Sequence, residues 1–421
     1  MSHLIRVFVC LFALATFGSA LAQNAYAQTA QTSAETAAKP VAHVYVNSGS
    51  GIVGFDVAAD GKLTAISGSP FHIDVSLAGG NGHYLFGFQP SSVVIASLSI
   101  AANGALKETA TLNTENYNPT PDCALTYWNG QGLAIDHSGA DLYNAAIPAD
   151  FPCRTTYQSF KIKESDGVLS FLGTTGDVLL GGASINILGN NQFIYTPSCN
   201  AAFGNGPYPY VGVFRRSSSG KLATTTSGVA IPAAPNDTYS PEGGSTPGYY
   251  CPIAMATDPT NHVAMTLYAI DNDTDGGGAI YGPRVIATYA ADANGNLKTT
   301  STYKNMATLP VDNDYEGDCL ACSALSIAPS GKLLAAGGPA GVLLFHFNGG
   351  SPVTKYKTLL AGNNIGTILW DNDNHMYALG TDSKGTEKLW VYTVTTSSVA
   401  EASGSPYAIT NAGGMYVQPL K

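Results

Sequence analysis

Apolar and polar positions alternate between residues 43 and 71 in three short runs that are separated by turns. The first run, 44–46, is wholly apolar; the second, 52–57, alternates; and the third, 63–66, follows a polar Asp60-Gly61 turn. Alternation with a period of two between Gly-rich and Asx-rich turns predicts three antiparallel strands. Three strands cannot cover both faces of a sheet, so this unit is expected to stack against copies of itself.

Copies of the unit recur along most of the chain, and the turn before the last strand marks them best. In each copy an Asx or Ser residue precedes Gly, which suits a tight hairpin, and a Leu then begins a core-facing strand. The copies of this turn are Asp60-Gly61-Lys62-Leu63, Asn103-Gly104-Ala105-Leu106, Asp166-Gly167-Val168-Leu169, Ser219-Gly220-Lys221-Leu222 and Asn294-Gly295-Asn296-Leu297.

Two further units, at 324–360 and 365–409, lack this turn but keep the strand pattern around it. The unit at 365–409 ends in Ser403-Gly404-Ser405-Pro406, the same sequence that ends the first unit of the chain at Ser67 to Pro70. No strand precedes His43, whereas a lone apolar run follows the last unit at 414–417. Pairing of that run with the first unit would close a ring and leave only short edges. We therefore predict an all-β fold, a seven-bladed β-propeller closed by its C-terminal strand.

The N-terminal segment has the pattern of an export signal. Arg6, an apolar run at 7–17 and Ala20-Leu21-Ala22 predict a signal peptide over 1–22, too short to span a bilayer. The Ala-, Thr- and Gln-rich segment 23–40 is expected to be a flexible leader, and 41–421 one propeller domain. These features predict a secreted or periplasmic protein without a membrane span, and we expect it to be a monomer.

Composition narrows the possible partners. Only 11% of the residues are charged, and the formal net charge is −10. Nucleic acids and anionic membranes need clustered Lys and Arg, and Arg215-Arg216 is the only basic pair, so neither is an expected partner.

Six cysteines remain after removal of the signal peptide, and in an oxidising compartment they are expected to form disulfides. In a four-stranded blade, the links between blades and the loops between second and third strands lie on one face. All six cysteines and the six longest insertions fall in such segments, so a disulfide-stapled, loop-rich face is predicted there. The preferred pairs are Cys123 with Cys153, Cys199 with Cys251, and Cys319 with Cys322.

Four residues of this face are candidates for catalytic chemistry. Arg154 and Arg284 lie in long predicted loops and could bind a carboxylate or polarise a carbonyl. Glu242 and His72 lie in links between blades and are candidate bases. His83, His137, His262 and His375 recur at the first hairpin of a blade, on the opposite face, where a structural role is expected.

Two acidic loops on the same face are candidate calcium sites. The first has carboxylates at the first, third and fifth positions of a calcium loop, followed by Gly, and the second lies beside it in the ring. The predicted ligands are Asp271, Asp273, Asp275, Asp312 and Asp314. The alternative is that both are solvated turns.

Several segments resemble the bacterial lactonase-type seven-bladed propellers, the family of 6-phosphogluconolactonase-like and carboxymuconate-lactonising proteins. The resemblance rests on VYVNSGSGIVGFDVAADGKLTAISGSPF, on GVLLFHF and SIAPSGKLLAAGG, and on the closing strand. It implies action on a lactone ring by His, Arg and Glu residues over the central channel. Two hypotheses follow: a propeller that binds a small lactone or carbohydrate-like ligand, with or without hydrolysing it, and a non-catalytic scaffold that docks a protein or a cell-wall glycan.

Overall fold

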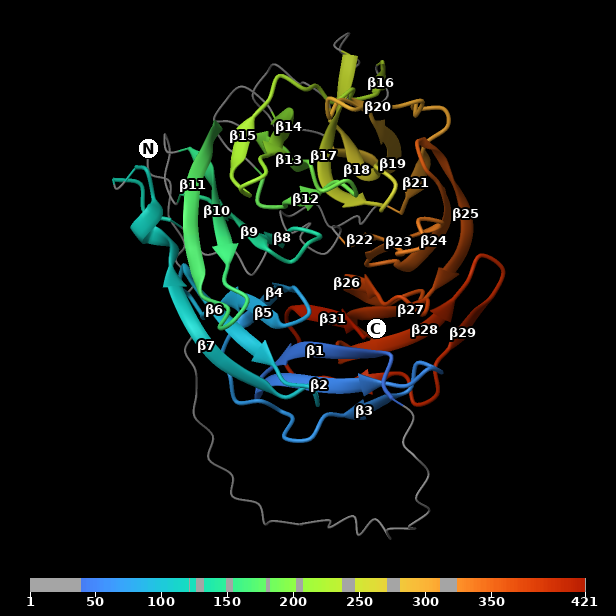
Figure 1. The fold of residues 1–421 in the computed structure, drawn as a ribbon. Coiled ribbons are helices and arrows are strands. Elements are labelled where there is room, and N and C mark those ends of the chain that lie inside the picture. The colour runs from blue at the N-terminus through green and yellow to red at the C-terminus, as the bar shows by residue number, and fades with distance from the viewer. Residues whose placement is uncertain are drawn as a thin grey trace, which may run out of the picture. The chain divides into compact units, whose positions relative to one another are not determined.

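Antiparallel strands form nearly all of the regular structure that the computed structural model describes (Figure 1), and among the described residues there is one short helix, η1 (Thr114–Tyr117). The structure describes residues 39–120, 122–125, 132–148, 154–178, 182–201, 207–236, 247–270, 281–310 and 324–420. The described strands group into seven sheets, each of which is one blade of a propeller. The predicted all-β, seven-bladed fold is therefore confirmed.

The first four blades each hold four strands. Blade 1 contains β31 (Met415–Pro419), β1 (Ala42–Ser48), β2 (Gly51–Val57) and β3 (Leu63–Ala65). Blade 2 contains β4 (Ser76–Gly80), β5 (Tyr84–Phe88), β6 (Val94–Ile100) and β7 (Leu106–Asn113). Blade 3 contains β8 (Leu133–Ile135), β9 (Asp141–Ala146), β10 (Thr155–Ile162) and β11 (Leu169–Val178). Blade 4 contains β12 (Asn186–Ile187), β13 (Phe193–Ala201), β14 (Pro207–Arg216) and β15 (Leu222–Thr224).

Blades 5 and 7 add extra strand segments to the same plan, whereas blade 6 holds four strands. Blade 5 contains β16 (Ala233–Asn236), β17 (Pro247–Thr257), β18 (His262–Ile270), β19 (Tyr281–Ala291), β20 (Leu297–Lys298) and β21 (Ala307–Leu309). Blade 6 contains β22 (Leu325–Ile327), β23 (Leu333–Gly338), β24 (Gly341–Asn348) and β25 (Ser351–Leu359). Blade 7 contains β26 (Asn364–Trp370), β27 (His375–Thr381), β28 (Glu387–Val394), β29 (Val399–Glu401) and β30 (Tyr407–Ala408). In blades 5 and 7 the outermost strand is split in two, so that β20 and β21 both pair with β19, and β29 and β30 with β28.

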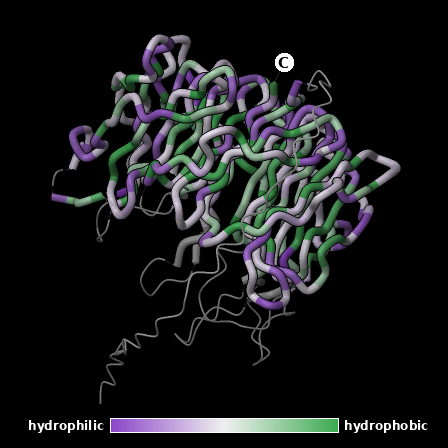
Figure 2. The backbone as a smooth tube through the Cα atoms, turned by 90° about the horizontal axis from the view of Figure 1, so that it is seen from below, coloured by the Kyte–Doolittle hydropathy of each residue, from purple (hydrophilic) through white to green (hydrophobic). Residues whose placement is uncertain are grey.

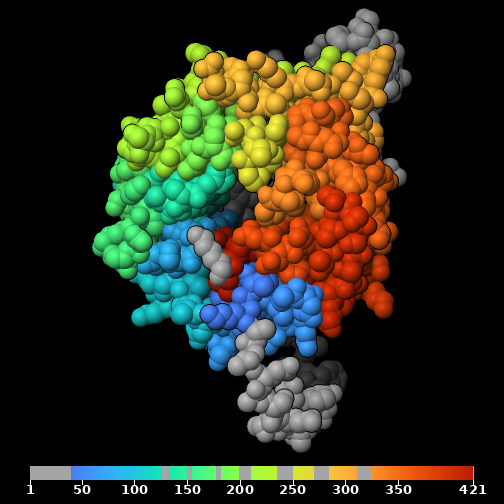
Figure 3. Space-filling view, turned by 45° about the vertical axis from the view of Figure 1, so that its right-hand side comes forward, coloured from blue at the N-terminus to red at the C-terminus, as the bar shows by residue number. Residues whose placement is uncertain are grey.

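The C-terminal strand closes the ring, as predicted. β31 pairs antiparallel with β1, with Val417 opposite Val44 and Pro419 opposite Ala42. Figure 3 shows the result at the surface, where the first and last colours of the chain adjoin after one circuit of the ring. Because β31 is the innermost strand of blade 1, the last residues of the chain complete the first blade.

The ring has two faces. On the link face the chain passes from one blade to the next and turns from second to third strand. On the hairpin face lie the first-to-second and third-to-fourth strand turns, which include the repeated Gly turns. Of the predicted site residues, His72 and Arg154 lie in described segments of the link face, and the four recurring histidines lie on the hairpin face. Among the residues described, no helix is long and apolar enough to cross a membrane.

Apolar side chains fill the seams between neighbouring blades. Apolar residues concentrate along the strands, and the most polar residues gather at the turns (Figure 2). One cluster joins Val44 and Val46 of β1 to Tyr377 and Leu389 of blade 7, with Val417 of β31. The alternation in each strand therefore supplies apolar faces on both sides of a blade, and burial of these faces drives the blades together.

The repeated turn glycines have a packing role that their sequence context did not reveal. In six seams the first or second residue of the second strand of one blade packs against the glycine in the third-to-fourth strand turn of the next blade. A Cβ on these glycines would lie 2.4–3.1 Å from that side chain. The pairs are Gly61 with His375, Gly104 with His43, Gly167 with Tyr84, Gly220 with Asp141, Gly295 with Phe193, and Gly349 with His262.

Tyrosine hydroxyls reinforce three of these seams. Two positions after the packing residue, a buried tyrosine donates a hydrogen bond to the carbonyl of the same turn glycine. The pairs are Tyr45 to Gly104 at 2.8 Å, Tyr143 to Gly220 at 2.9 Å and Tyr195 to Gly295 at 2.9 Å. Since each hydroxyl is satisfied in the apolar seam, it adds direction to a contact that packing alone would leave adjustable.

Candidate functional site

Three of the predicted catalytic residues are described, and they belong to three different parts of the ring. Arg154 is exposed and directly precedes β10 of blade 3. His72 lies in the link between blades 1 and 2, where its Nδ1 is 3.2 Å from the Ser50 carbonyl oxygen. Arg284 is half-buried in β19 of blade 5, so its predicted place in a loop was wrong.

Arg284 sits in the seam between blades 5 and 6. Its backbone pairs with Tyr268 and Leu309, and it lines a water-sized cavity of about 20 Å³ with Pro310 and Gly337. This cavity is too small for a lactone. Glu242 and the predicted calcium ligands Asp271, Asp273, Asp275, Asp312 and Asp314 lie outside the described residues, so calcium binding stays a prediction.

A larger hollow, of about 590 Å³, lies where the innermost strands surround the ring axis. Its walls come from β4, β17, β26 and β31 and from residues beside them. The lining residues are Ser76, Leu77, Ala78, Ser184, Ile253, Ala254, Met255, Gly366, Thr367, Leu369, Gly413, Gly414 and Met415. These side chains are apolar, small or hydroxylated, and none of them is charged.

Small residues keep this channel hollow open. A Cβ on Gly366 would have no atom within 4 Å, whereas one on Gly414 would lie 2.4 Å from the Leu77 carbonyl oxygen. Gly366 is the bulge residue of β26, since the pairing with β27 shifts register between Ile365 and Thr367. The bulge therefore places a position without a side chain at the channel wall, and sequence reasoning did not find it.

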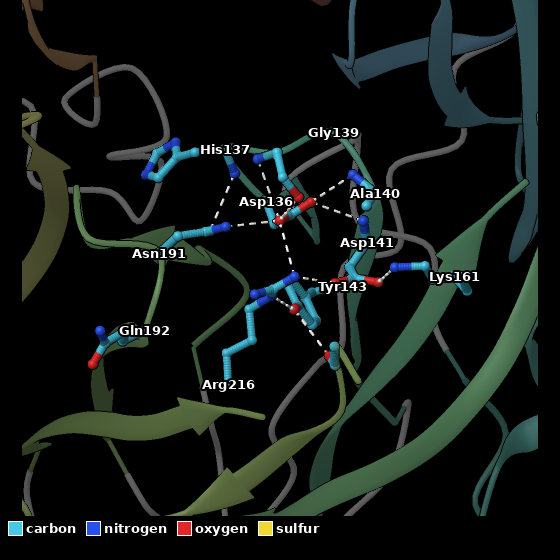
Figure 4. Close-up of polar contacts among 12 residues, drawn as sticks. Asp136, His137, Gly139, Ala140, Asp141, Tyr143, Lys161, Asn191, Gln192 and Arg216 are labelled. Atoms are coloured by element: carbon cyan, nitrogen blue, oxygen red, sulfur yellow. Dashed lines mark hydrogen bonds and ion pairs between the residues drawn. The ribbon is translucent and has the colours of Figure 1, made fainter. Parts of the chain in front are cut away.

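Among the described residues, a dense group of charges lies elsewhere, in the seam between blades 3 and 4 on the hairpin face (Figure 4). Arg216 Nη2 is 3.1 Å from Asp136 Oδ2 and forms a second ion pair with Asp141 Oδ2, and its Nε donates to the Tyr143 hydroxyl at 3.0 Å. Lys161 Nζ lies 3.0 Å from Asp141 Oδ1. Both carboxylates are fully buried, at 0% side-chain exposure, so each depends on these cations.

Asp136 is saturated with donors. It accepts hydrogen bonds from the backbone of Ala140 and Asp141 at 2.7 and 2.8 Å and from Asn191 Nδ2 at 2.8 Å. Burial alone would raise the pKa of Asp136, but these bonds, one from Ser138, and the charge of Arg216 hold it below its ordinary value. A carboxylate with this many partners is an anchor for the hairpin and has no lone pair left for a ligand.

Beside this group a hollow of about 750 Å³ opens on the hairpin face, lined by residues that include His83, Asp136, His137 and Lys161. Asp136 and Lys161 are committed to the buried ion pairs. The His137 ring is directed to blade 4, where Nε2 is 3.0 Å from the Leu188 carbonyl oxygen. Asp136, His137 and Lys161 therefore make contacts within blade 3 or across the seam between blades 3 and 4.

The four recurring histidines lie at first hairpins, as predicted. His262 and His375 pack against turn glycines of the next blade, and each pairs with a carboxylate four residues earlier, Asp258 at 3.2 Å and Asp371 at 2.7 Å. These contacts give both residues structural roles. The sequence signal was the repeated Asp-x-x-x-His spacing, which sequence reasoning passed over.

Comparison with solved structures agrees with the ring geometry. A proposed 6-phosphogluconolactonase from Bacteroides fragilis matches with a TM-score of 0.50 and 12% identity over 90% of this chain and 98% of that chain. A protein from Lactobacillus plantarum matches with a TM-score of 0.52 and 12% identity over 90% and 99%. The chain shares its propeller fold with these structures.

Solved structures of proteins with other names share this fold. A hypothetical selenium-binding protein from Sulfolobus tokodaii matches with a TM-score of 0.53 and 11% identity over 91% of this chain and 94% of that chain. No family model and no curated protein matches the sequence. At such identities the likeness defines the propeller architecture, and the activity has to be argued from the site.

Proposed function

We propose that this protein is an exported lactonase-like propeller that binds a small, uncharged carbohydrate-like or lactone ligand in the channel hollow. The observation that carries the proposal is the hollow of about 590 Å³ on the ring axis, a volume within the usual range for small-molecule sites. Export is proposed from the signal-like segment 1–22.

The lining supports an uncharged ligand. Ser76, Ser184 and Thr367 supply hydroxyl groups, and Leu77 and Met255 supply apolar surface. A sugar ring presents the same mixture of hydroxyl groups and C–H faces. A phosphate or carboxylate would need a cation for charge-assisted hydrogen bonds, and the described lining has none. A phosphorylated sugar lactone is therefore disfavoured as the ligand.

Hydrolysis of a bound lactone is the second candidate function, favoured by the likeness in fold to a proposed lactonase. It needs a base and a group that polarises the carbonyl close to the ring. Arg154, Arg284 and His72 are proposed for these roles on sequence grounds, yet none of them lines the channel hollow. Binding without turnover is therefore the first candidate, and Glu242 is the proposed base if turnover occurs.

The loops of the link face are proposed to be held by disulfides. The preferred partners Cys199 and Cys251 lie in β13 and β17, which contact each other across the seam between blades 4 and 5. A bridge there would fix a wall of the channel. A docking role for this face, toward a protein or a cell-wall glycan, would use its surface instead of the hollow.

The test is ligand-dependent thermal stabilisation of the oxidised mature protein, measured with neutral sugar lactones, neutral sugars and their anionic counterparts, with acid release followed in the same samples. Gly366→Leu fills the hollow at a position with free space, and Gly228→Leu is the matched control because a Cβ there also meets nothing within 4 Å. We expect neutral ligands to stabilise the natural protein and the control but not Gly366→Leu. Equal stabilisation of all three proteins, or stabilisation by anionic ligands only, would contradict the proposal.

Acid release separates the two candidate functions. If acid release accompanies binding and is lost in Arg154→Ala, Arg284→Ala or Glu242→Gln, the protein is a hydrolase whose site includes that link-face residue. If stabilisation occurs without acid release, the protein is a binding propeller. A rise in melting temperature on adding calcium alone would support the predicted calcium sites in the acidic loops.

A further inference from the structure

The hollow of about 750 Å³ on the hairpin face is separate from the channel hollow, because the two have no lining residue in common. The strands β4 and β31 contribute to both. Ser76 and Met415, at the starts of these strands, line the channel hollow, whereas Gly80 and Gln418, toward their ends, line the hollow on the hairpin face. A volume of this size lies within the usual range for small-molecule sites.

The wall that blade 2 supplies is the first hairpin of that blade, and this hairpin is fixed. Asn81 Oδ1 accepts the backbone N–H groups of His83 and Tyr84, at 3.1 and 2.9 Å. Asn81 Nδ2 donates to the Gly139 carbonyl oxygen of blade 3 at 2.8 Å. The hairpin that carries His83 is therefore bonded both within itself and to the facing hairpin of blade 3.

The opposite wall includes the third-to-fourth strand turn of blade 3, which carries Glu164. The Tyr84 hydroxyl donates to the Glu164 carbonyl oxygen at 3.0 Å, and Ser97 Oγ donates to the Gly167 carbonyl oxygen at 2.9 Å. A Cβ on Gly167 would lie 2.7 Å from the Tyr84 ring. Blade 2 thus holds this turn at two points, so the walls are fixed before any ligand binds, which lowers the entropic cost of binding.

The cation that lines this hollow is already paired. Lys161 Nζ lies 3.0 Å from Asp141 Oδ1, and Arg216 pairs with both Asp136 and Asp141 (Figure 4). Two cations and two carboxylates therefore form a neutral group. Among the described lining residues, Lys161 is the only Lys or Arg.

Glu164 adds a negative charge that this group does not balance. Glu164 is exposed and lines the hollow, and the neighbouring Lys163 pairs with Asp166 instead. Within the described part of the chain, neither the Glu164 carboxylate nor the His83 ring has a hydrogen bond or an ion pair. One free carboxylate and one free imidazole therefore line a hollow whose other charges cancel.

This distribution of charge selects the class of ligand. An anion would find Lys161 occupied and would be repelled by Glu164. An ammonium group would gain a charge-assisted hydrogen bond from the same carboxylate. The described residues contain no group of three His, Cys, Asp or Glu side chains that could hold a metal ion, whereas a single carboxylate is sufficient for one ammonium group.

We propose that the hollow on the hairpin face is a second ligand site, which binds a small organic cation of about the size of an amino sugar. The ammonium group pairs with the Glu164 carboxylate, and the polar body of the ligand lies beside the His83 imidazole. This site does not depend on the function proposed for the channel hollow, since a neutral ligand there would use a different set of residues.

The test is isothermal titration of the mature protein with glucosamine, which carries a protonated amine, and with glucose, which has the same ring without the charge. Glu164→Gln keeps the shape of the side chain and removes the charge. Glu108→Gln is the control, since Glu108 is an exposed carboxylate of β7 that lies outside the hollow. We expect glucosamine to bind the natural protein and Glu108→Gln, and to bind Glu164→Gln about tenfold or more weakly.

Three outcomes would overturn the proposal: no binding of glucosamine to the natural protein, equal binding to Glu164→Gln and Glu108→Gln, or an affinity for glucosamine that salt does not weaken. Both substitutions are at exposed positions, and matching melting temperatures would confirm that the variants fold alike.

Gly366→Leu, which fills the channel hollow, separates the two sites. Glucosamine should bind this variant as it binds the natural protein, and loss of its binding would place the amine in the channel and overturn the proposal. Glucose binding in the same variant tests the channel hollow alone. The two proposals therefore fail through different ligands and different substitutions.

Discussion

The hydroxyl of Tyr195 donates a hydrogen bond of 2.9 Å to the carbonyl oxygen of Gly295, one hundred residues later in the chain. Tyr195 is fully buried in β13 of blade 4, and Gly295 lies in the turn between β19 and β20 of blade 5. The contact therefore fixes one blade against the next at the hairpin face. Similar bonds join Tyr45 to Gly104 and Tyr143 to Gly220.

Removal of this hydroxyl should weaken the seam. Tyr195→Phe keeps the ring but leaves the Gly295 carbonyl without this donor, so we expect a loss of about 1 kcal/mol in the free energy of unfolding. Tyr303→Phe is the control because Tyr303 is 48% exposed. Denaturant unfolding measures both. An equal effect of the two substitutions would mean that the inter-blade bond contributes no stability.

Gly295 itself should be much less replaceable than a glycine in an open turn. Gly295 has φ +81° and a Cβ there would lie 2.4 Å from the Phe193 ring, whereas Gly385 has φ +78° and open space around a Cβ. Gly385→Ala should cost about 1 kcal/mol of backbone strain. Gly295→Ala carries the same strain and also forces Phe193 to move, so its midpoint of unfolding should fall well below that of Gly385→Ala. Matching midpoints would show that the seam accommodates the methyl group.

Arg216 should be essential to the seam between blades 3 and 4. Arg216→Met leaves the buried Asp136 and Asp141 with one fewer cation, and loss of one partner of a buried ion pair typically costs about 3–5 kcal/mol. Arg215→Met is the neighbouring control, since Arg215 is exposed. The loss should be measured by denaturant unfolding at neutral pH.

The same variant should respond to acid in a defined way. The donors around Asp136 lower its pKa, so its contribution to stability is present above about pH 3.8, the ordinary value, and is lost as pH falls through the lowered one. Once the Asp136 carboxyl is protonated, the difference in stability between Arg216→Met and the natural protein should shrink. A difference that stays constant down to pH 3 would indicate that Arg216 acts through packing alone.

The C-terminal strand should be required for the ring. Deletion of residues 413–421 removes β31 and leaves β1 with an exposed inner edge and the channel hollow without Met415. We expect loss of the cooperative thermal transition or aggregation, since an unpaired edge templates association. Deletion of Lys421 alone is the control. A truncated protein that melts at the full-length temperature would show that the ring does not depend on this closure.

The sequence alone determined the number of blades, the fold class and the closure. These features depend on local periodicity, on the Gly turns before Leu63, Leu106 and Leu297, and on one unpaired apolar run at the C-terminus. A strand that presents apolar side chains on a face needs apolar side chains packed against that face, whichever residues of the chain supply them. The expectation that His262 and His375 are structural also followed from repetition alone.

Only the tertiary structure decided which distant residues meet. Sequence context explained the turn glycines by backbone conformation, but their contacts with residues such as Phe193 and Asp141 come from the neighbouring blade. Arg284, expected in a loop, lies in β19 because strand pairing extends further than local propensity indicates. Partners one blade apart are separated by dozens of residues, so no local pattern encodes them. The uncharged channel and the paired Arg216, Asp136 and Asp141 appear only when the ring closes.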